Sequence, residues 1–217
     1  MVTNGTFLLK QVPGLVEAGL DAIDISLDAG QETHDRLRGR RGTFQAAIQG
    51  IRALAAERSA RGLHKPLISV SAVLLPEAVE ELPSLIREVR VEGIDGFFLG
   101  RLQYTTEEQG KSHEMNFQKL FQITPQSWKG FAHPLQPGSS QKVRAIVEEL
   151  RADPANKDFI KWGNPFWSSQ DFFNYYENPA TAAPLGRACH FPWDSVSITP
   201  NGDVCPCPDY RILLWEM

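Results

Sequence analysis

Short strands and helices alternate along residues 1–102, and this order restricts the possible folds more than any other feature of the sequence. The predicted strands are Val2–Gly5, Ala22–Leu27, Leu67–Leu75 and Gly96–Leu102. The predicted helices between them are Phe7–Ala18, the stretch from Thr43 to Gly62, and Val79–Val89, which Gly93 follows as a stop. Connections of this length join parallel strands. The fold class is therefore α/β with a parallel sheet, either open or rolled into a barrel.

Side chains in two of these strands alternate so that one face of the sheet is apolar and the other polar. In the first, Ile23, Ile25 and Leu27 oppose Asp24, Ser26 and Asp28; in the second, Ile68, Val70 and Ala72 oppose Ser69, Ser71 and Val73. A parallel strand with helices on both sides is apolar throughout. A polar second face instead favours a β/α barrel that holds a polar ligand at its carboxyl-terminal strand ends. Serines that merely fill a tight interior are the alternative.

The sequence predicts four strands of this kind, whereas a closed β/α barrel has about eight. We therefore expect a partial barrel, in a chain that begins inside a domain. Residues 103–138 show no clear period, a helix is predicted from Ser139 or Ser140 to Leu150, and Phe159–Tyr176 is rich in aromatic residues that favour packing over ligand stacking. The predicted division is a barrel core over 1–138, a helical and aromatic bridge over 139–187, and a cysteine-containing extension over 188–217.

Composition excludes several classes of protein. With 42% apolar and 22% charged residues the chain is not a disordered one, and its net charge of −4 argues against nucleic-acid partners. No apolar run approaches the ~20 residues of a membrane span, and the N-terminus lacks the regions of a signal peptide. Three cysteines are too few for a disulfide framework. We expect a cytoplasmic globular protein with no membrane partner.

A first candidate site follows the second strand. Ser26 stands at its end, and the following loop contains His34 and four arginines, Arg36, Arg38, Arg40 and Arg41. Guanidinium groups suit carboxylates, so a serine and an arginine here could hold a ligand that carries a carboxylate and hydroxyls. A solvated basic loop is the competing interpretation.

A second candidate site contains all three cysteines. Cys189 precedes the strand-like Val196–Thr199, the turn at Asn201-Gly202 follows, and Cys205 and Cys207 come after it. A hairpin of this length would bring Cys189 close to Cys207. Paired thiolates suit an iron–sulfur cluster or zinc. A zinc site that also uses His190, and plain buried thiols, both remain open.

Together these segments resemble the radical S-adenosylmethionine (SAM) enzymes that carry a SPASM-type extension. The matching stretches are VTNGTFLL, GLDAIDISLDAG, HDRLRGRRGTFQAAIQGI, GIDGFFLGRL and CHFPWDSVSITPNGDVCPC. The resemblance implies that Ser26 and Arg38 contact SAM, that Leu102 lies against its adenosine, and that Thr3 and Asn4 line the cavity floor. It also implies a cofactor contact at Ser71, a substrate contact at Ser69, and an auxiliary [4Fe–4S] cluster on Cys189 and Cys207, with Cys205 as a further metal ligand.

The sequence departs from this family in one respect that bears on catalysis. The 217 residues contain no Cys-x3-Cys-x2-Cys motif, with which the family binds the cluster that cleaves SAM. We expect a fragment of a radical SAM/SPASM oxidoreductase or maturase that acts on a peptide or small molecule, with a redox donor protein as partner. The alternatives are a non-catalytic metal- or nucleotide-binding remnant, and an α/β-barrel protein with a zinc-binding tail.

Overall fold

The computed structural model describes residues 1–122, 124, 127–132, 136–163, 174–177, 196–198, 202 and 204–205. The chain forms two compact units, the first made of Met1–Leu102 and Pro137–Phe173 and the second of Gln103–Gln136 and Asn174–Met217. The first unit contains the sheet that the strand pattern predicted. The predicted boundaries after residues 138 and 187 stay a prediction.

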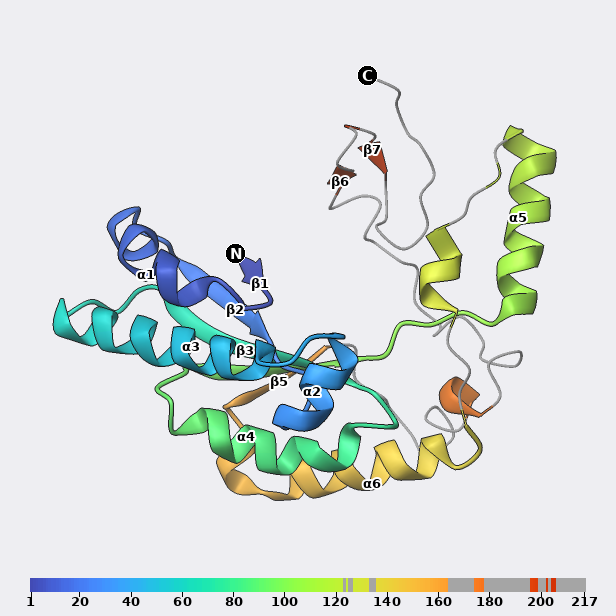
Figure 1. Ribbon diagram of the computed structural model, residues 1–217. Coiled ribbons are helices and arrows are strands. Elements are labelled where there is room, and N and C mark those ends of the chain that lie inside the picture. The colour runs from blue at the N-terminus through green and yellow to red at the C-terminus, as the bar shows by residue number, and fades with distance from the viewer. Residues whose placement is uncertain are drawn as a thin grey trace. The chain divides into compact units, whose positions relative to one another are not determined.

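The first unit is a partial β/α barrel built on a five-stranded sheet (Figure 1). Its strands are β1 (Val2–Thr3), β2 (Ala22–Ser26), β3 (Leu67–Leu74), β4 (Gly96–Arg101) and β5 (Ile160–Gly163). They lie side by side in chain order, and every neighbouring pair is parallel. The α/β class and the parallel sheet are thereby confirmed. The fifth strand was not predicted, because its four residues lie in a segment whose aromatic content masks any alternation.

Helices connect the strands and cover one face of the sheet. In chain order they are α1 (Leu8–Glu17), α2 (Gln31–Leu37), α3 (Thr43–Ala60), the 3₁₀ turn η1 (Val79–Glu81), α4 (Leu82–Arg90), α6 (Ser139–Ala152) and the 3₁₀ turn η3 (Pro154–Asn156). The buried side of α3 presents Phe44, Ala47, Ile48, Ile51 and Leu54. Ala47 and Ile25 of β2 both border Gly5, which places α3 against the apolar face.

The two faces of the sheet differ in exposure as their side chains predicted. The apolar face is buried, with exposures of at most 3% at Ile23, Ile25, Leu27, Ile68, Val70, Ala72, Leu74, Phe97, Leu99 and Ile160. On the opposite face Asp24, Ser26, Ser69 and Ser71 are half-buried and Phe98 is exposed. The serines therefore do not fill a closed interior.

The second unit contains α5 (Glu107–Phe121), the 3₁₀ turn η2 (Ser127–Phe131) and the strands β6 (Ser197–Ile198) and β7 (Val204–Cys205). The region of α5 showed no clear period, but its start carries a reciprocal cap. The Thr106 hydroxyl accepts the Gln109 N–H, and the Gln109 side chain accepts the Thr106 N–H. This Thr-x-x-Gln spacing was the signal that could have predicted the helix.

Strands β6 and β7 are antiparallel, with Ser197 opposite Cys205 and Gly202 at a φ of 91° between them. This pairing agrees with the expected hairpin. Cys189 and Cys207 lie outside the described residues, so their predicted proximity stays a prediction. Within the described part of the chain, the helices are too short or too polar to cross a membrane.

Candidate functional site

The tight turn after β1 uses the oxygens of both predicted floor residues. The Gly5 N–H donates to the Thr3 hydroxyl at 3.2 Å, and the Thr6 N–H donates to the Asn4 side-chain oxygen at 3.1 Å. Gly5 has a φ of 72°, and a Cβ there would come within 2.7 Å of the Ala47 Cβ. Glycine is therefore required at this position. The Thr3 hydroxyl hydrogen and the Asn4 amide hydrogens remain for a ligand.

An acidic centre lies in the middle of the polar face. The Asp24 carboxylate accepts hydrogen bonds from Ser69 at 2.7 Å and from Ser71 at 2.5 Å. The register places Asp24 beside Ser69 and Ser26 beside Ser71. A carboxylate has about four acceptor positions, so Asp24 keeps room for further donors. The two serines predicted as ligand contacts thus lie together with Asp24 on the polar face, and their contact with a ligand stays a prediction.

Ser26 differs from the other two serines, since none of the described residues forms a hydrogen bond with its hydroxyl. It is half-buried at the carboxyl-terminal end of β2, where parallel sheets place their ligands. A hydroxyl in this position has both its donor and its acceptor capacity available to a bound molecule.

Arg38 is fixed by Asp28, which follows β2. Its Nε lies 2.7 Å from one carboxylate oxygen, and its Nη2 donates to the other at 3.1 Å. The buried His34 approaches the same residue, and its Nδ1 accepts the Asp28 N–H at 3.1 Å. Burial raises the pKa of Asp28, but the neighbouring His34 and Arg38 outweigh it and hold this pKa below its usual value. Arg38 keeps 35% of its side chain exposed, so its remaining N–H groups can reach a ligand.

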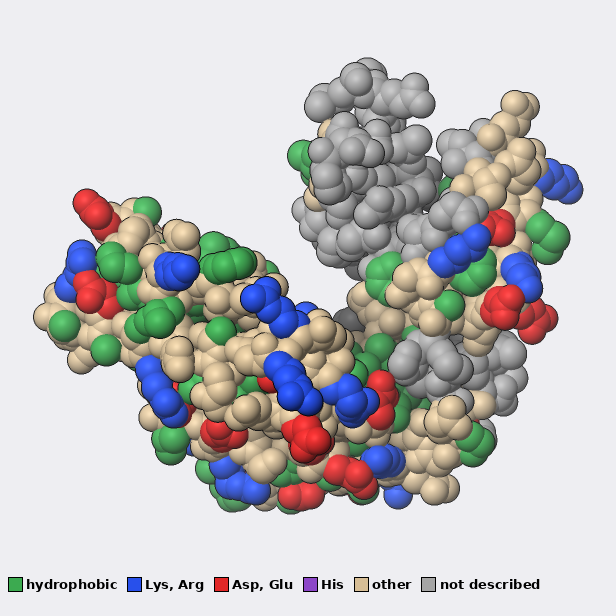
Figure 2. Space-filling model, in the orientation of Figure 1, with side chains coloured by type: hydrophobic (Ala, Val, Ile, Leu, Met, Phe, Trp, Pro, Cys, Tyr) green, Lys and Arg blue, Asp and Glu red, His purple; other side chains and the backbone are tan. Residues whose placement is uncertain are grey.

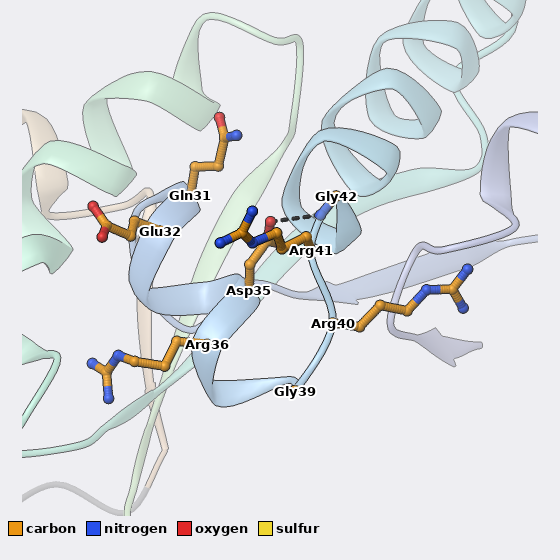
Figure 3. Close-up of a pocket in the computed structure, with 8 residues that line it drawn as sticks. All are labelled: Gln31, Glu32, Asp35, Arg36, Gly39, Arg40, Arg41 and Gly42. Carbon is orange, nitrogen blue, oxygen red and sulfur yellow. Dashed lines mark hydrogen bonds between the residues drawn. The ribbon is translucent and has the colours of Figure 1, made fainter.

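Asp35 has a structural role that its place in the basic loop did not reveal. Its carboxylate accepts hydrogen bonds from the Gly42 N–H at 2.6 Å, the Thr43 hydroxyl at 2.7 Å and the Phe44 N–H at 2.9 Å. These bonds lower the pKa of Asp35 to about 2. The residue therefore caps α3 from the neighbouring helix and fixes the loop between them (Figure 3).

The α2–α3 loop encloses a hollow of about 670 Å³. Arginines 36, 40 and 41 line it, and Figure 3 shows Arg36 and Arg40 pointing to opposite sides. None of the three forms an ion pair with another described residue. Figure 2 shows this basic surface over α2 with acidic side chains beside it. The solvated-loop interpretation thus fits these three arginines, whereas Arg38 is held in place.

The sheet brings the predicted residues of the first unit to one edge. Thr3 ends β1 and Asn4 follows it, Ser26 ends β2, and Leu102 directly follows β4. On β3, Ser71 lies beside Ser26 and Ser69 lies two residues further back, and both serines face the same side as Asp24. Sequence reasoning did not select Asp24, Asp28 or Phe98 as site residues, although the alternation had placed both acids on the polar face.

In the part of the chain that the structure describes, no group of three or more His, Cys, Asp or Glu side chains is arranged to hold a metal ion. Of the three cysteines, Cys205 is described only through its backbone in β7, and the other two are not described. The assignment of Cys189, Cys205 and Cys207 to a cluster therefore stays a prediction.

Comparisons with known proteins give a consistent result for the first unit. Residues 1–89 match the model of the radical SAM superfamily. Pre-heme d1 synthase of Dinoroseobacter shibae is 29% identical over 103 residues, which are 47% of this chain and 24% of that protein. A probable GTP 3',8-cyclase of Methanopyrus kandleri is 35% identical over 96 residues, which are 43% of this chain and 29% of that protein.

A longer match is the tungsten-containing aldehyde ferredoxin oxidoreductase cofactor-modifying protein of Pyrococcus furiosus. It is 30% identical over 213 residues, which are 97% of this chain and 49% of that protein. Among solved structures, Streptococcus suis SuiB bound to S-adenosylmethionine has a TM-score of 0.49 and 12% identity, over 86% of this chain and 36% of that one. The chain spans about half or less of the length of each of these relatives.

Proposed function

Because the chain belongs to the radical SAM superfamily, which uses SAM and a [4Fe–4S] cluster, we propose that the polar face of its sheet binds SAM for a radical modification of a small molecule. The observation that carries this proposal is the arginine held at the carboxyl-terminal edge. Asp28 fixes Arg38 with two contacts while more than a third of the guanidinium-bearing side chain stays exposed. Ser26 ends β2, the strand that Asp28 follows, and its hydroxyl forms no hydrogen bond with another described residue.

The residues present fit SAM better than they fit a cluster. SAM carries a carboxylate, an amine and two ribose hydroxyls, for which an exposed guanidinium, a free serine hydroxyl and the Asn4 amide are suitable partners. We assign the carboxylate to Arg38 and a ribose hydroxyl to Ser26, with Leu102 against the adenosine. Ser71 would contribute to the same cofactor pocket.

The [4Fe–4S] cluster of the superfamily supplies the electron for reductive cleavage of SAM. The described residues do not form a site for it, so radical generation is not assigned to residues of this chain. Two further elements belong to the proposal. Cys189, Cys205 and Cys207 would serve an auxiliary, SPASM-type site, and a redox donor protein would deliver the electron.

The small-molecule substrate is supported by the relatives. Their names concern pre-heme d1, GTP and the cofactor of a tungsten-containing oxidoreductase, and none of these is a peptide. For this chain we therefore favour a cofactor or cofactor precursor over the peptide that the SPASM resemblance also allowed. Ser69 and Asp24 would contact it from the floor of the sheet.

Equilibrium dialysis of the 217-residue chain against labelled SAM tests the proposal. A charge-assisted hydrogen bond contributes about 1.5–3 kcal/mol, so Arg38→Ala should weaken SAM binding roughly tenfold to hundredfold. Arg41→Ala, in the same loop but without an ion pair, is the matched control and should leave the affinity unchanged. If Arg38→Ala and the unmodified chain bind SAM with equal affinity, Arg38 does not contact SAM. If the unmodified chain shows no saturable SAM binding, the SAM site on this face is refuted.

A further inference from the structure

One aromatic side chain among the described residues of the sheet lies on its polar face. Phe98 in β4 is 43% exposed, whereas its neighbours Phe97 and Leu99 are each 1% exposed on the opposite face. The helices that bury the apolar face do not cover it. The Phe98 ring is therefore accessible to a molecule that binds on this face.

Glycines surround Phe98 on this face. Gly96 and Gly100 stand two residues before and after it, and the register pairs Gly100 with Gly163 of β5. A methyl group built on Gly163 would overlap the Phe98 ring, and one built on Gly100 would lie 3.5 Å from it. The ring therefore inclines toward the carboxyl-terminal end of the sheet, over backbone that carries no side chains. The exposed part of the ring thus lies near the edge of the sheet where ligands bind in β/α barrels.

Groups of different polarity flank the ring in one row across the sheet. The register places Ser71 beside Phe98 on β3 and Lys161 beside it on β5. Neighbouring strands are about 4.8 Å apart, so both groups are within reach of a ligand that covers the ring. The Ser71 hydroxyl donates a hydrogen bond to the Asp24 carboxylate, whereas the exposed Lys161 has no ion pair among the described residues.

We propose that Phe98 is the aromatic floor of a substrate subsite for a planar conjugated ring that carries hydrogen-bond donors on one side and an acidic group on the other. The donors meet Asp24 with its two serines, the ring covers Phe98, and the acidic group pairs with Lys161. This subsite deepens the proposed function and rests on it, because both place the reaction on the polar face of the sheet. It uses residues distinct from Ser26 and Arg38.

The test measures binding of two planar acidic probes to the 217-residue chain by equilibrium dialysis. GTP represents a nucleotide with phosphates, and coproporphyrin III represents a macrocycle with carboxylates. The probe that binds more tightly therefore shows whether the acidic group is a phosphate or a carboxylate. Tripolyphosphate and citrate are the anions without a ring. Stacking on an aromatic side chain changes affinity by about 1–3 kcal/mol, which is roughly five- to 150-fold.

We expect Phe98→Leu to weaken the better probe by about tenfold and Phe98→Trp to retain it within about threefold. Lys161→Gln should also weaken binding of the ring probe. Val91→Ala is the control, because Val91 is an 81% exposed apolar residue directly after α4, on the side of the sheet that the helices cover. Unchanged binding in Phe98→Leu, equal binding of the ringless anions, or failure of both ring probes to bind would overturn the subsite.

The same samples separate this proposal from the proposed function. SAM binding is measured in parallel for the unmodified chain, Phe98→Leu and Arg38→Ala. If ring binding depends on Phe98 while SAM does not bind, the subsite stands and the SAM site fails. If SAM binding depends on Arg38 while Phe98→Leu leaves ring binding unchanged, the subsite fails and the SAM site stands.

Discussion

Replacing Asp35 with alanine should destabilise the first unit through the start of α3. The carboxylate is 9% exposed and accepts three hydrogen bonds, from the Gly42 and Phe44 N–H groups and the Thr43 hydroxyl. These bonds lower its pKa from the ordinary 3.8 to about 2. At about 1.36 kcal/mol per pH unit, this difference corresponds to roughly 2 kcal/mol of stability. The figure agrees with the upper end of about 2 kcal/mol for the loss of a helix cap.

The pH dependence of this contribution follows from its sign. A carboxyl whose pKa is lower in the folded chain stabilises it above the ordinary pKa, and the contribution disappears as the pH falls through about 2. Asp35→Ala should therefore lose about 2 kcal/mol of unfolding free energy at pH 7. The difference from the unmodified chain should shrink between pH 4 and pH 2.

Urea unfolding at pH 7 and at pH 2, followed by circular dichroism, measures the difference in unfolding free energy between Asp35→Ala and the unmodified chain. Glu32→Ala is the matched control, because Glu32 is an exposed acid on the same helix and the hydrogen bonds that cap α3 come from Asp35. We expect it to change the unfolding free energy by less than about 0.5 kcal/mol. Equal stability of Asp35→Ala and the unmodified chain at pH 7, or a difference that persists in full at pH 2, would refute the reasoning.

Two further predictions concern Gly5, in the turn after β1, and Asp28, which holds Arg38. Gly5→Ala should lower the unfolding free energy by about 1–3 kcal/mol in urea titrations, because the new Cβ would come within 2.7 Å of Ala47 at a φ of 72°; a change below about 0.5 kcal/mol would contradict the tight packing. Asp28→Asn should weaken SAM binding severalfold in dialysis by releasing Arg38, and Asp28→Glu should restore part of it; unchanged SAM affinity would show that Arg38 needs no fixing.

Much of the fold could be predicted because the period of side chains reports directly on which face is buried. The alternation of Ile23 and Ile25 with Asp24 and Ser26 predicted a polar face, and the structure places these residues accordingly. Three elements escaped this reasoning. Helix α2 contains His34 and Arg36, which the sequence analysis placed in a loop, because seven residues are too few to show a clear helical period. Strand β5 is four residues long, and α5 has a weak apolar face, so its capping pair Thr106 and Gln109 was the stronger signal.

By itself, the sequence determined the order of β1 to β4, the helices α1, α3 and α4, and the two faces of the sheet, because periodicity is a local property of consecutive residues. Tertiary structure decided which of the polar side chains act together. Asp24 meets Ser69 and Ser71 across 45 and 47 positions, and the Phe98 ring meets Gly163 on another strand. Such partners depend on strand register and on helix packing, which couple distant positions through space and leave no periodic trace in the chain.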